Sequence, residues 1–117
     1  MKNINDTLHA LEELCSPRVL SEVNNHYVKV AKVHGKLPMH KHKSDELFII
    51  QKGEMVMEIE GEFFNLKEGD VFLVKKGQMH RPIAEDVCEC ILVEQKDLLH
   101  TGEESFDITK TIEEQLE

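Results

Sequence analysis

The sequence predicts an all-β fold that closes on itself as a sandwich, a jelly roll or a small barrel. Seven or so short apolar runs follow one another between turns that contain glycine or asparagine. No long segment with a helical period separates these runs, which argues against parallel strands joined by helices. The chain of 117 residues is long enough to bury one compact core. We therefore expect a single domain over residues 1–117.

The first 18 residues are the exception, because they predict a short amphipathic helix. Asp6 or Thr7 can cap this helix, and Pro17 ends it. Its apolar positions recur at helical spacing and are Leu8, Leu11 and Leu14.

After this helix the apolar pattern changes to short runs that are typical of strands. Asn24 and Asn25 indicate a turn, and Gly61 between two apolar runs indicates a tight hairpin. The tail over residues 96–117 is acidic and loses the alternation, so we expect a surface loop and a short C-terminal helix. The expected strands cover residues 18–23, 26–33, 46–51, 54–60, 62–66, 70–74 and 87–94.

The charge of the chain argues against several classes of partner. Its 14 basic and 23 acidic residues give a formal net charge of -9, which repels phosphate backbones and anionic membranes. With one tyrosine, five phenylalanines and no tryptophan, a surface that stacks on bases is also unexpected. No apolar run is long enough to cross a bilayer, and the N-terminus lacks the pattern of a signal peptide. We expect a soluble, cytoplasmic protein with no nucleic-acid or membrane partner.

The three cysteines, Cys15, Cys88 and Cys90, are an odd number in a chain that does not need disulfides, which indicates reduced thiols. Cys88 and Cys90 share one face of an apolar run, so we expect them to be buried. A zinc site would need further cysteines at ligand spacing.

The segment GKLPMHKHKSDELFIIQKG, residues 35–53, carries the strongest functional signal. In an extended strand His40 and His42 point to the same side, about 6.6 Å apart, so both imidazoles can reach one ion. Lys41 and Lys43 would then point to the opposite face. The pattern predicts a metal site at this corner of the fold.

Two further residues complete the candidate metal site. Glu46 follows a turn and opens the next strand, so its carboxylate can return to the same ion. His80 opens a strand later in the chain and is the candidate for the fourth ligand. Its spacing alone does not place it at the same ion.

The two stretches resemble the paired motifs of the cupin family, G-x5-H-x-H-x3,4-E-x6-G and G-x5-P-x-G-x2-H-x3-N. The first motif is one residue short between its glycine and its first histidine. The second has Lys75 in place of the proline and Ala84 in place of the asparagine, and neither departure falls on a metal ligand. The matching residues are Gly35, His40, His42, Glu46 and Gly53 in the first motif, and Gly69, Gly77 and His80 in the second.

The resemblance covers roughly residues 27–95 and is greatest to small proteins labelled mannose-6-phosphate isomerase-like. This label depends on the fold and does not establish isomerase activity. The resemblance implies a cupin jelly-roll (double-stranded β-helix) barrel, often a homodimer, with one metal ion at its centre. The ligands that it implies are His40, His42, Glu46 and His80.

Three imidazoles and one carboxylate suit one divalent transition metal ion, with Fe, Mn, Ni, Zn and Cu as candidates. A six-coordinate ion would keep two positions open for a small metal-chelating molecule. This favours a metal-dependent enzyme of dioxygenase, isomerase or lyase type. The alternative is a non-catalytic module that binds a metal ion or a small ligand. A literal sugar-phosphate isomerase would need cations inside its pocket, whereas the basic residues near the motif are expected to alternate outward.

Few other residues suggest a catalytic role. Tyr27, the only tyrosine, begins a strand and is a weak catalytic candidate, with a half-buried aromatic as the simpler interpretation. Glu58 is expected to face solvent, and Arg81 is expected to point away from the metal. His34 is expected at the surface unless its segment doubles back. We expect no role for His9, His26 and His100. The apolar side chains expected to line the barrel are Phe48, Ile50, Met55, Met57, Val71, Leu73 and Ile83.

Overall fold

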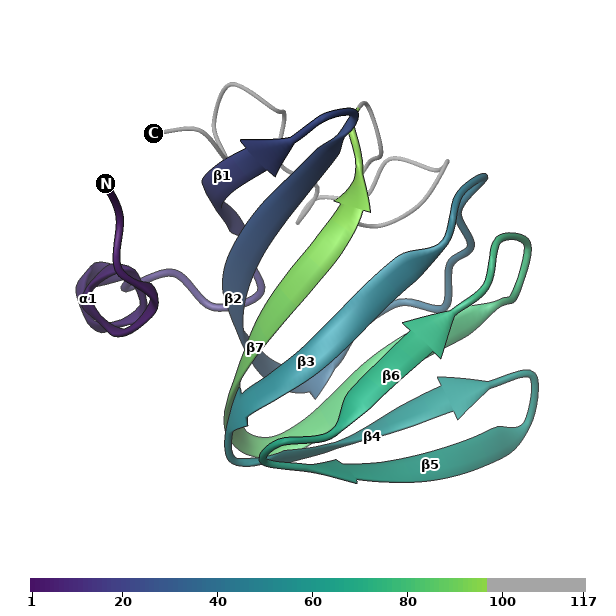
Figure 1. Ribbon diagram of the computed structural model, residues 1–117. Helices are drawn as coiled ribbons and strands as arrows, with labels where there is room; N and C mark the ends of the chain where they lie inside the picture. Colours follow the sequence, from purple (N-terminus) through teal and green to yellow (C-terminus); the bar gives the residue numbers. More distant parts are fainter. Residues whose placement is uncertain (97–117) are drawn as a thin grey trace.

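The computed structural model describes residues 1–96, which form one helix and seven strands (Figure 1). The predicted all-β fold is confirmed, and each predicted strand has a counterpart. The predicted C-terminal helix lies outside the described residues. The elements are α1 (Ile4–Ala10), β1 (Arg18–Val23), β2 (His26–Lys36), β3 (Glu46–Lys52), β4 (Glu54–Ile59), β5 (Glu62–Lys67), β6 (Val71–Val74) and β7 (His80–Gln95).

The strands pair antiparallel, and β7 takes part in both layers of the barrel. Five strands lie in the order β1-β2-β7-β3-β6, while β4 pairs with β5 and with β7. The first residues of β7 pair with β4, where His80 lies opposite Ile59. Its later residues pair with β2 on one side and β3 on the other. The 16 residues of β7 therefore join the two layers (Figure 1).

Alternate side chains of the strands fill the barrel, as the period of two in a strand requires. On β7 the inward side chains include Cys88 and Cys90, which are fully buried free thiols, as predicted. Four of the side chains predicted to line the barrel belong to this core. They are Phe48, Ile50, Met55 and Met57.

The prediction is wrong for Val71, Leu73 and Ile83. Val71 and Leu73 are 62% and 45% exposed, because the inward positions of β6 are the even-numbered ones, which end at the buried Val74. All four residues of this strand are apolar, so its sequence does not indicate which side chains point inward. Ile83 is only partly buried, because its neighbour Ala84 occupies the inward position on β7.

The helix α1 covers the outer face of the sheet. Its N-cap is Asn3, whose side chain accepts a hydrogen bond of 3.0 Å from the Asp6 backbone N–H, so the predicted cap at Asp6 or Thr7 is wrong. The helix ends at Ala10, which leaves Leu14 outside it and 46% exposed.

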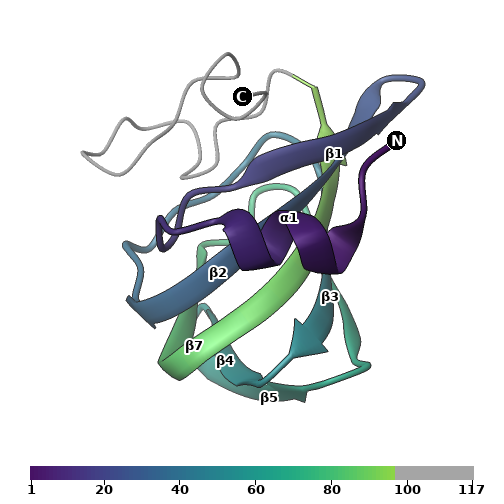
Figure 2. The same ribbon diagram turned by 90° about the vertical axis from the view of Figure 1, so that its left-hand side faces the viewer.

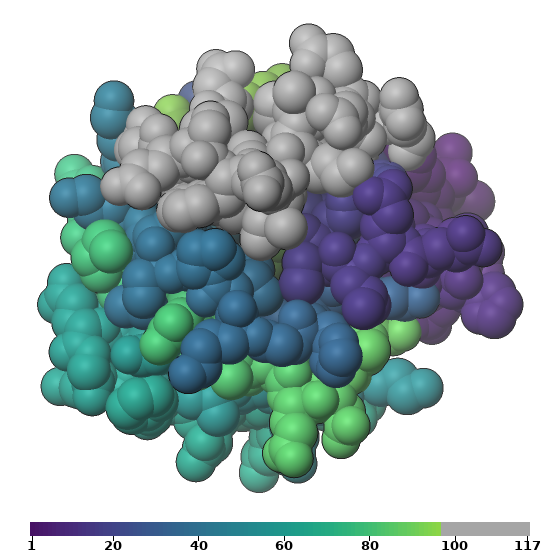
Figure 3. All heavy atoms as spheres, turned by 180° about the vertical axis from the view of Figure 1, so that it is seen from behind, coloured from purple at the N-terminus to yellow at the C-terminus, as the bar shows by residue number. Residues whose placement is uncertain are grey.

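Leu8 holds α1 in place by packing on Val30 of β2 and Ile91 of β7. Figure 2 shows the helix lying across these two strands. From behind, the N-terminal segment lies at one side of the molecule and the teal strands β4 and β5 lie at the other (Figure 3).

The predicted turns adopt backbone conformations that fit their residues. Glu60 and Gly61, with φ of 47° and 87°, form the tight hairpin between β4 and β5. Asn24, with φ of 52°, lies in the turn between β1 and β2. Within residues 1–96 no helix is both long and apolar enough to span a membrane.

Candidate metal centre

Four buried side chains converge at one end of the barrel, and they are the four that the sequence predicts. One ligand atom from each lies within 4.8 Å of those of the others. Glu46 is the first residue of β3 and His80 the first of β7, while two histidines come from the segment between β2 and β3. Each side chain is at most 6% exposed. The four residues are His40, His42, Glu46 and His80.

A short backbone pairing positions two of these histidines. The His40 N–H donates to the carbonyl of His80 at 2.9 Å, and the His80 N–H donates back to His40 at 2.8 Å. The segment around His42 is not a strand, contrary to the expectation of an extended strand here. The expected alternation is nevertheless present, because Lys41 and Lys43 are exposed while the two histidines are buried.

Backbone carbonyls orient two of the imidazoles. The Nδ1 atom of His40 lies 2.8 Å from the Pro38 carbonyl, and the Nδ1 atom of His80 lies 2.9 Å from the Gln78 carbonyl. Because a carbonyl only accepts, Nδ1 carries the proton in each ring and the lone pair is left on Nε2. This tautomer leaves Nε2 of each ring able to bind a metal ion.

Four other polar atoms of the cluster lack hydrogen-bond partners among the described residues. Both ring nitrogens of His42, Nε2 of His80 and Oε1 of Glu46 are buried in this state. The Nε2 atoms of His42 and His80 lie 3.4 and 3.5 Å from Glu46 Oε1, which is long for a hydrogen bond. Buried polar groups without partners are costly, and a shared cation would satisfy one of these atoms from each side chain. The residues therefore fit a metal ion.

The charges of the cluster favour the protonation states that bind metals. Burial and the neighbouring His80 lower the pKa of His40 from 6.5 to about 4, so its imidazole is neutral at neutral pH. Burial alone would raise the pKa of Glu46, but its contacts with His42 and His80 hold that pKa well below its ordinary value. A neutral imidazole and an ionised carboxylate are the ligand forms.

Sequence analysis missed a buried charged pair beside this cluster. Glu94 of β7 lies directly opposite Glu46 of β3, and its carboxylate is 2.7 Å from the ammonium group of Lys29 on β2. Burial and the negative charge of Glu46 raise the pKa of Glu94 well above its ordinary value, against the effect of Lys29. A signal was available, since Lys29 and Glu94 fall on the inward phase of their strands, in step with Ala31 and Cys90.

The structure places Tyr27 in the same row of side chains. Tyr27 on β2 lies opposite Glu94 and is buried, with the ammonium groups of Lys29 and Lys96 at 5.6 and 5.5 Å from its ring centre. These distances suit cation–π contacts. Tyr27 thus packs with the charged pair, and no hydroxyl contact within the described residues links it to the four ligands.

The other residues considered from the sequence lie apart from the cluster. Glu58 is half-buried, not fully solvent-facing as expected, because it accepts a hydrogen bond of 2.8 Å from Arg81. This pair turns Arg81 toward β4, which agrees with the expectation that it points away from the metal. The exposed histidines are His9, His26 and His34, while His100 lies outside the described residues.

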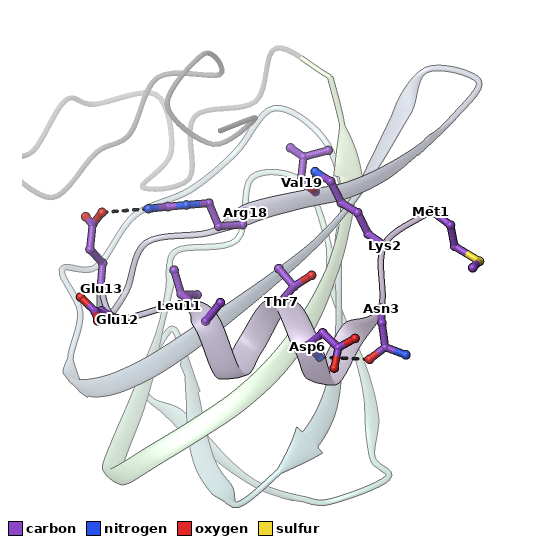
Figure 4. Close-up of a pocket in the computed structure, with 11 residues that line it drawn as sticks. Met1, Lys2, Asn3, Asp6, Thr7, Leu11, Glu12, Glu13, Arg18 and Val19 are labelled. Atoms are coloured by element: carbon purple, nitrogen blue, oxygen red, sulfur yellow. Dashed lines mark hydrogen bonds and ion pairs between the residues drawn. The ribbon is translucent and has the colours of Figure 1, made fainter.

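A pocket of about 610 Å³ lies away from these residues, between α1 and β1 (Figure 4). Two of its charged lining residues, Arg18 and Glu13, form an ion pair of 2.8 Å, which is drawn in Figure 4. None of its lining residues is a histidine or a cysteine. The chemistry of the described residues therefore points to the four-residue cluster and not to this larger pocket.

Comparisons with known proteins agree with the fold. A family model described as "Cupin domain" matches residues 26–94. The uncharacterized protein YdbB of Bacillus subtilis (strain 168) is 36% identical over 83 residues, which cover 69% of this chain and 74% of YdbB.

Two solved structures show the same fold. A cupin-2 domain containing protein from Shewanella frigidimarina has 30% identity and a TM-score of 0.79, over 82% of this chain and 95% of that one. Hydroquinone 1,2-dioxygenase from Sphingomonas sp. TTNP3, with 4-hydroxybenzoate bound, has 18% identity and a TM-score of 0.74, over 80% of this chain and 31% of that one. The extent of the family match, together with the identity to YdbB, shows that the chain belongs to the cupin family.

Proposed function

We propose that this protein binds one divalent transition metal ion through four side chains and acts on a small metal-chelating molecule. The reaction would be of dioxygenase, isomerase or lyase type. Fe, Mn, Ni, Zn and Cu are the candidate metals, because the donor set combines imidazole nitrogens with one carboxylate. The proposed ligands are His40, His42, Glu46 and His80.

The observation that supports this proposal is the set of buried nitrogen and oxygen atoms without hydrogen-bond partners. A structural polar network would satisfy its members internally. Here Pro38 and Gln78 fix the rings of two histidines and leave Nε2 without a proton. The atoms are thus prepared for a cation that can also accept other ligands.

A bound divalent ion would polarise the substrate oxygen atoms or exchange electrons with the substrate. The chain itself contributes orientation and exclusion of water. The apolar side chains of Phe48, Met57 and Leu92 belong to the core of the same barrel and keep its interior dry. Lys29 offsets the charge of Glu94, so the interior is not left with two adjacent uncompensated carboxylates.

Metal binding is tested first, with His42→Ala and Glu46→Ala compared with His34→Ala. His34 is an exposed histidine outside the cluster, so its replacement is a matched control. Metal-free protein is titrated with Zn(II) and Co(II) by calorimetry and visible absorption. We expect one ion per chain for the wild type and His34→Ala, and at least about 100-fold weaker binding for the other two variants. Equal affinity in all four proteins would contradict the proposal.

Turnover is tested next with protein loaded anaerobically with Fe(II), Mn(II), Ni(II) or Zn(II). The substrates are chelating acids, enols, thiols, sugars and phenols, and oxygen uptake separates dioxygenase chemistry from isomerase and lyase chemistry. The similarity to a hydroquinone dioxygenase shows the fold alone, so phenols are only one class in this panel. Uniform inactivity with every metal would contradict an enzyme.

A non-catalytic binding module is the second candidate. The observation that favours it is that Glu94, the additional acidic group nearest the cluster, is already held by Lys29. In this case small chelators would bind the loaded protein without being converted. The cytoplasmic location and the homodimer expected from the sequence remain part of the proposal, and light scattering at several concentrations measures the second.

A further inference from the structure

A small pocket adjoins the metal cluster and has a positively charged rim. It has a volume of about 330 Å³, within the range of sites that hold small molecules. The segment before β3 and the loop after β6 line it, at the right-hand end of the barrel in Figure 1. The lining residues are Lys41, His42, Lys43, Lys76 and Gly77.

Backbone contacts hold the two loops together at this rim. The Gly77 N–H donates to the His42 carbonyl at 2.9 Å, and the Lys76 N–H donates to Asp45 Oδ1 at 2.9 Å. Gly77 has φ of 80°, a conformation that glycine adopts without strain. These hydrogen bonds hold the two loops side by side, so the backbone itself places their lysines around one opening.

The charge of the rim is opposite to that of the whole protein. The chain carries 23 acidic and 14 basic residues, yet three lysines gather here and none of the lining residues is acidic. Of the nearby carboxylates, the exposed Asp45 accepts the backbone N–H of Lys76 and offsets one of the three positive charges, while Glu46 is buried beside the histidines. A local cationic opening in an acidic protein concentrates anions at that point.

His42 connects this opening to the metal cluster. His42 is one of the lining residues although it is only 3% exposed, and neither of its ring nitrogens has a hydrogen-bond partner within residues 1–96. The same side chain lies 3.4 Å from Glu46. A molecule in the pocket would therefore lie next to a candidate metal ligand.

We propose that the molecule that reaches the metal centre is a small carboxylate anion, drawn in by Lys41, Lys43 and Lys76. This inference rests on the proposed function, and it narrows the metal-chelating substrate to an anionic one. Lysine ammonium groups act as point charges and suit a mobile anion at an entrance, whereas fixed bidentate recognition would call for arginine. One carboxylate oxygen with an adjacent oxygen donor would chelate the ion. No covalent step is part of this inference.

The test compares a triple variant at the rim with a matched triple variant elsewhere. Lys41→Gln/Lys43→Gln/Lys76→Gln and Lys36→Gln/Lys52→Gln/Lys67→Gln each remove three exposed lysines and change the formal net charge from -9 to -12. Each protein is loaded with Co(II) and titrated with oxalate, a chelating dianion, and with maltol, a chelator that is uncharged at neutral pH. The Co(II) absorption spectrum reports binding of both.

At low ionic strength we expect oxalate to bind the rim variant about tenfold more weakly than the wild type, and the control variant within about twofold. Added salt should shrink the difference, because it screens exposed charges. Maltol should bind all three proteins alike. In metal-free wild type, oxalate should shift the amide resonances of Lys41 and Gly77, and the rim variant should lose this response.

Each contrary result has a separate meaning. Equal oxalate affinity in the wild type and the rim variant, with Co(II) bound to both, overturns the anionic ligand and leaves the metal centre in place. Equal weakening in the control variant shows that net charge alone is responsible and also overturns it. A failure of Co(II) to bind the wild type overturns the proposed function and, with it, this inference.

Discussion

Lys29 and Glu94 form an ion pair of 2.7 Å between neighbouring strands, with side chains that are 1% and 0% exposed. Taking both charges out of water is costly, and the pair persists only because each group neutralises the other. Its position is as informative as its geometry, since Glu94 lies opposite the candidate ligand Glu46. Lys29 therefore offsets one of the two negative charges that Glu46 and Glu94 would place inside the barrel.

Replacing one member of this pair should destabilise the protein strongly. Lys29→Met leaves Glu94 buried without its cation, and we expect a loss of about 3–5 kcal/mol in the free energy of unfolding. Urea denaturation measures this loss. The double variant Lys29→Met/Glu94→Gln should recover a large part of it, because it removes both charges. Additive losses in the double variant would show that the two residues do not act as a pair.

The stability of the metal-free protein should fall as the pH is lowered from about 7 to about 4. His40 has a pKa of about 4 when folded and 6.5 as its ordinary value, so the unfolded chain takes up a proton first on acidification. At 1.36 kcal/mol per pKa unit, the contribution lost from His40 is about 3 kcal/mol. The contribution of His40 to stability is fully present above pH 6.5. It is lost as the pH falls from 6.5 to the folded-state pKa of about 4.

Glu94 acts in the opposite direction. Its pKa is raised in the folded state, so its contribution to the stability of the folded protein grows as the pH falls. The contribution of His40 is therefore measured as the difference between the wild type and His40→Gln over this pH range. We expect a flatter profile for the variant. Parallel profiles would contradict the lowered pKa of His40.

Gly53→Ala should cost more stability than Gly61→Ala. Both glycines have positive φ, of 89° and 87°, so both replacements carry the backbone strain of about 1–2 kcal/mol. A Cβ atom at residue 53 would also lie 3.1 Å from the Val87 carbonyl oxygen, whereas one at residue 61 would meet no heavy atom within 4 Å. Thermal unfolding of both variants measures the added cost of the contact with Val87. Equal melting temperatures would contradict this cost.

Metal binding should stabilise the folded chain by mass action. With free Zn(II) at about 100 times its dissociation constant, we expect a gain of about 2.7 kcal/mol in the free energy of unfolding. His80→Ala should lose this gain, while His34→Ala should keep it, because only His80 lies in the cluster. Urea denaturation with Zn(II) and with a chelator measures both, and a gain that survives in His80→Ala would speak against this residue as a ligand.

Local patterns predict the strands and the grouping of His40, His42 and Glu46, whereas His80 was assigned to the cluster through the resemblance to the cupin motifs. Alternation in β3 and β7, glycine at the turns and the spacing of His40 and His42 are all visible in the letters. The face of β6 was not predictable, since all four of its residues are apolar and only pairing with β3 decides that Val71 and Leu73 turn outward.

Two other differences have physical reasons of their own. The N-cap of α1 is Asn3 and not the predicted Asp6 or Thr7. Several polar residues near the N-terminus can cap a helix, and the packing of Leu8 against the sheet favours the helix that begins after Asn3. Lys29 and Glu94 were overlooked because charged residues are expected outside, and only a partner on the adjacent strand makes their burial tolerable.

The long strand β7 has a consequence for how this chain can change over generations. His80 at its start and Glu94 near its end both occupy inward, even-numbered positions. The pairing of β7 with β2 shifts between Ala84 and Cys88, so an extra residue there can be absorbed. One inserted or deleted residue between Cys88 and Glu94 would instead turn Glu94 toward the outside, while His80 stayed in place. Length variation should therefore be confined to turns such as the one at Gly61 and to this irregularity, and the number of residues from Cys88 to Glu94 should stay the same.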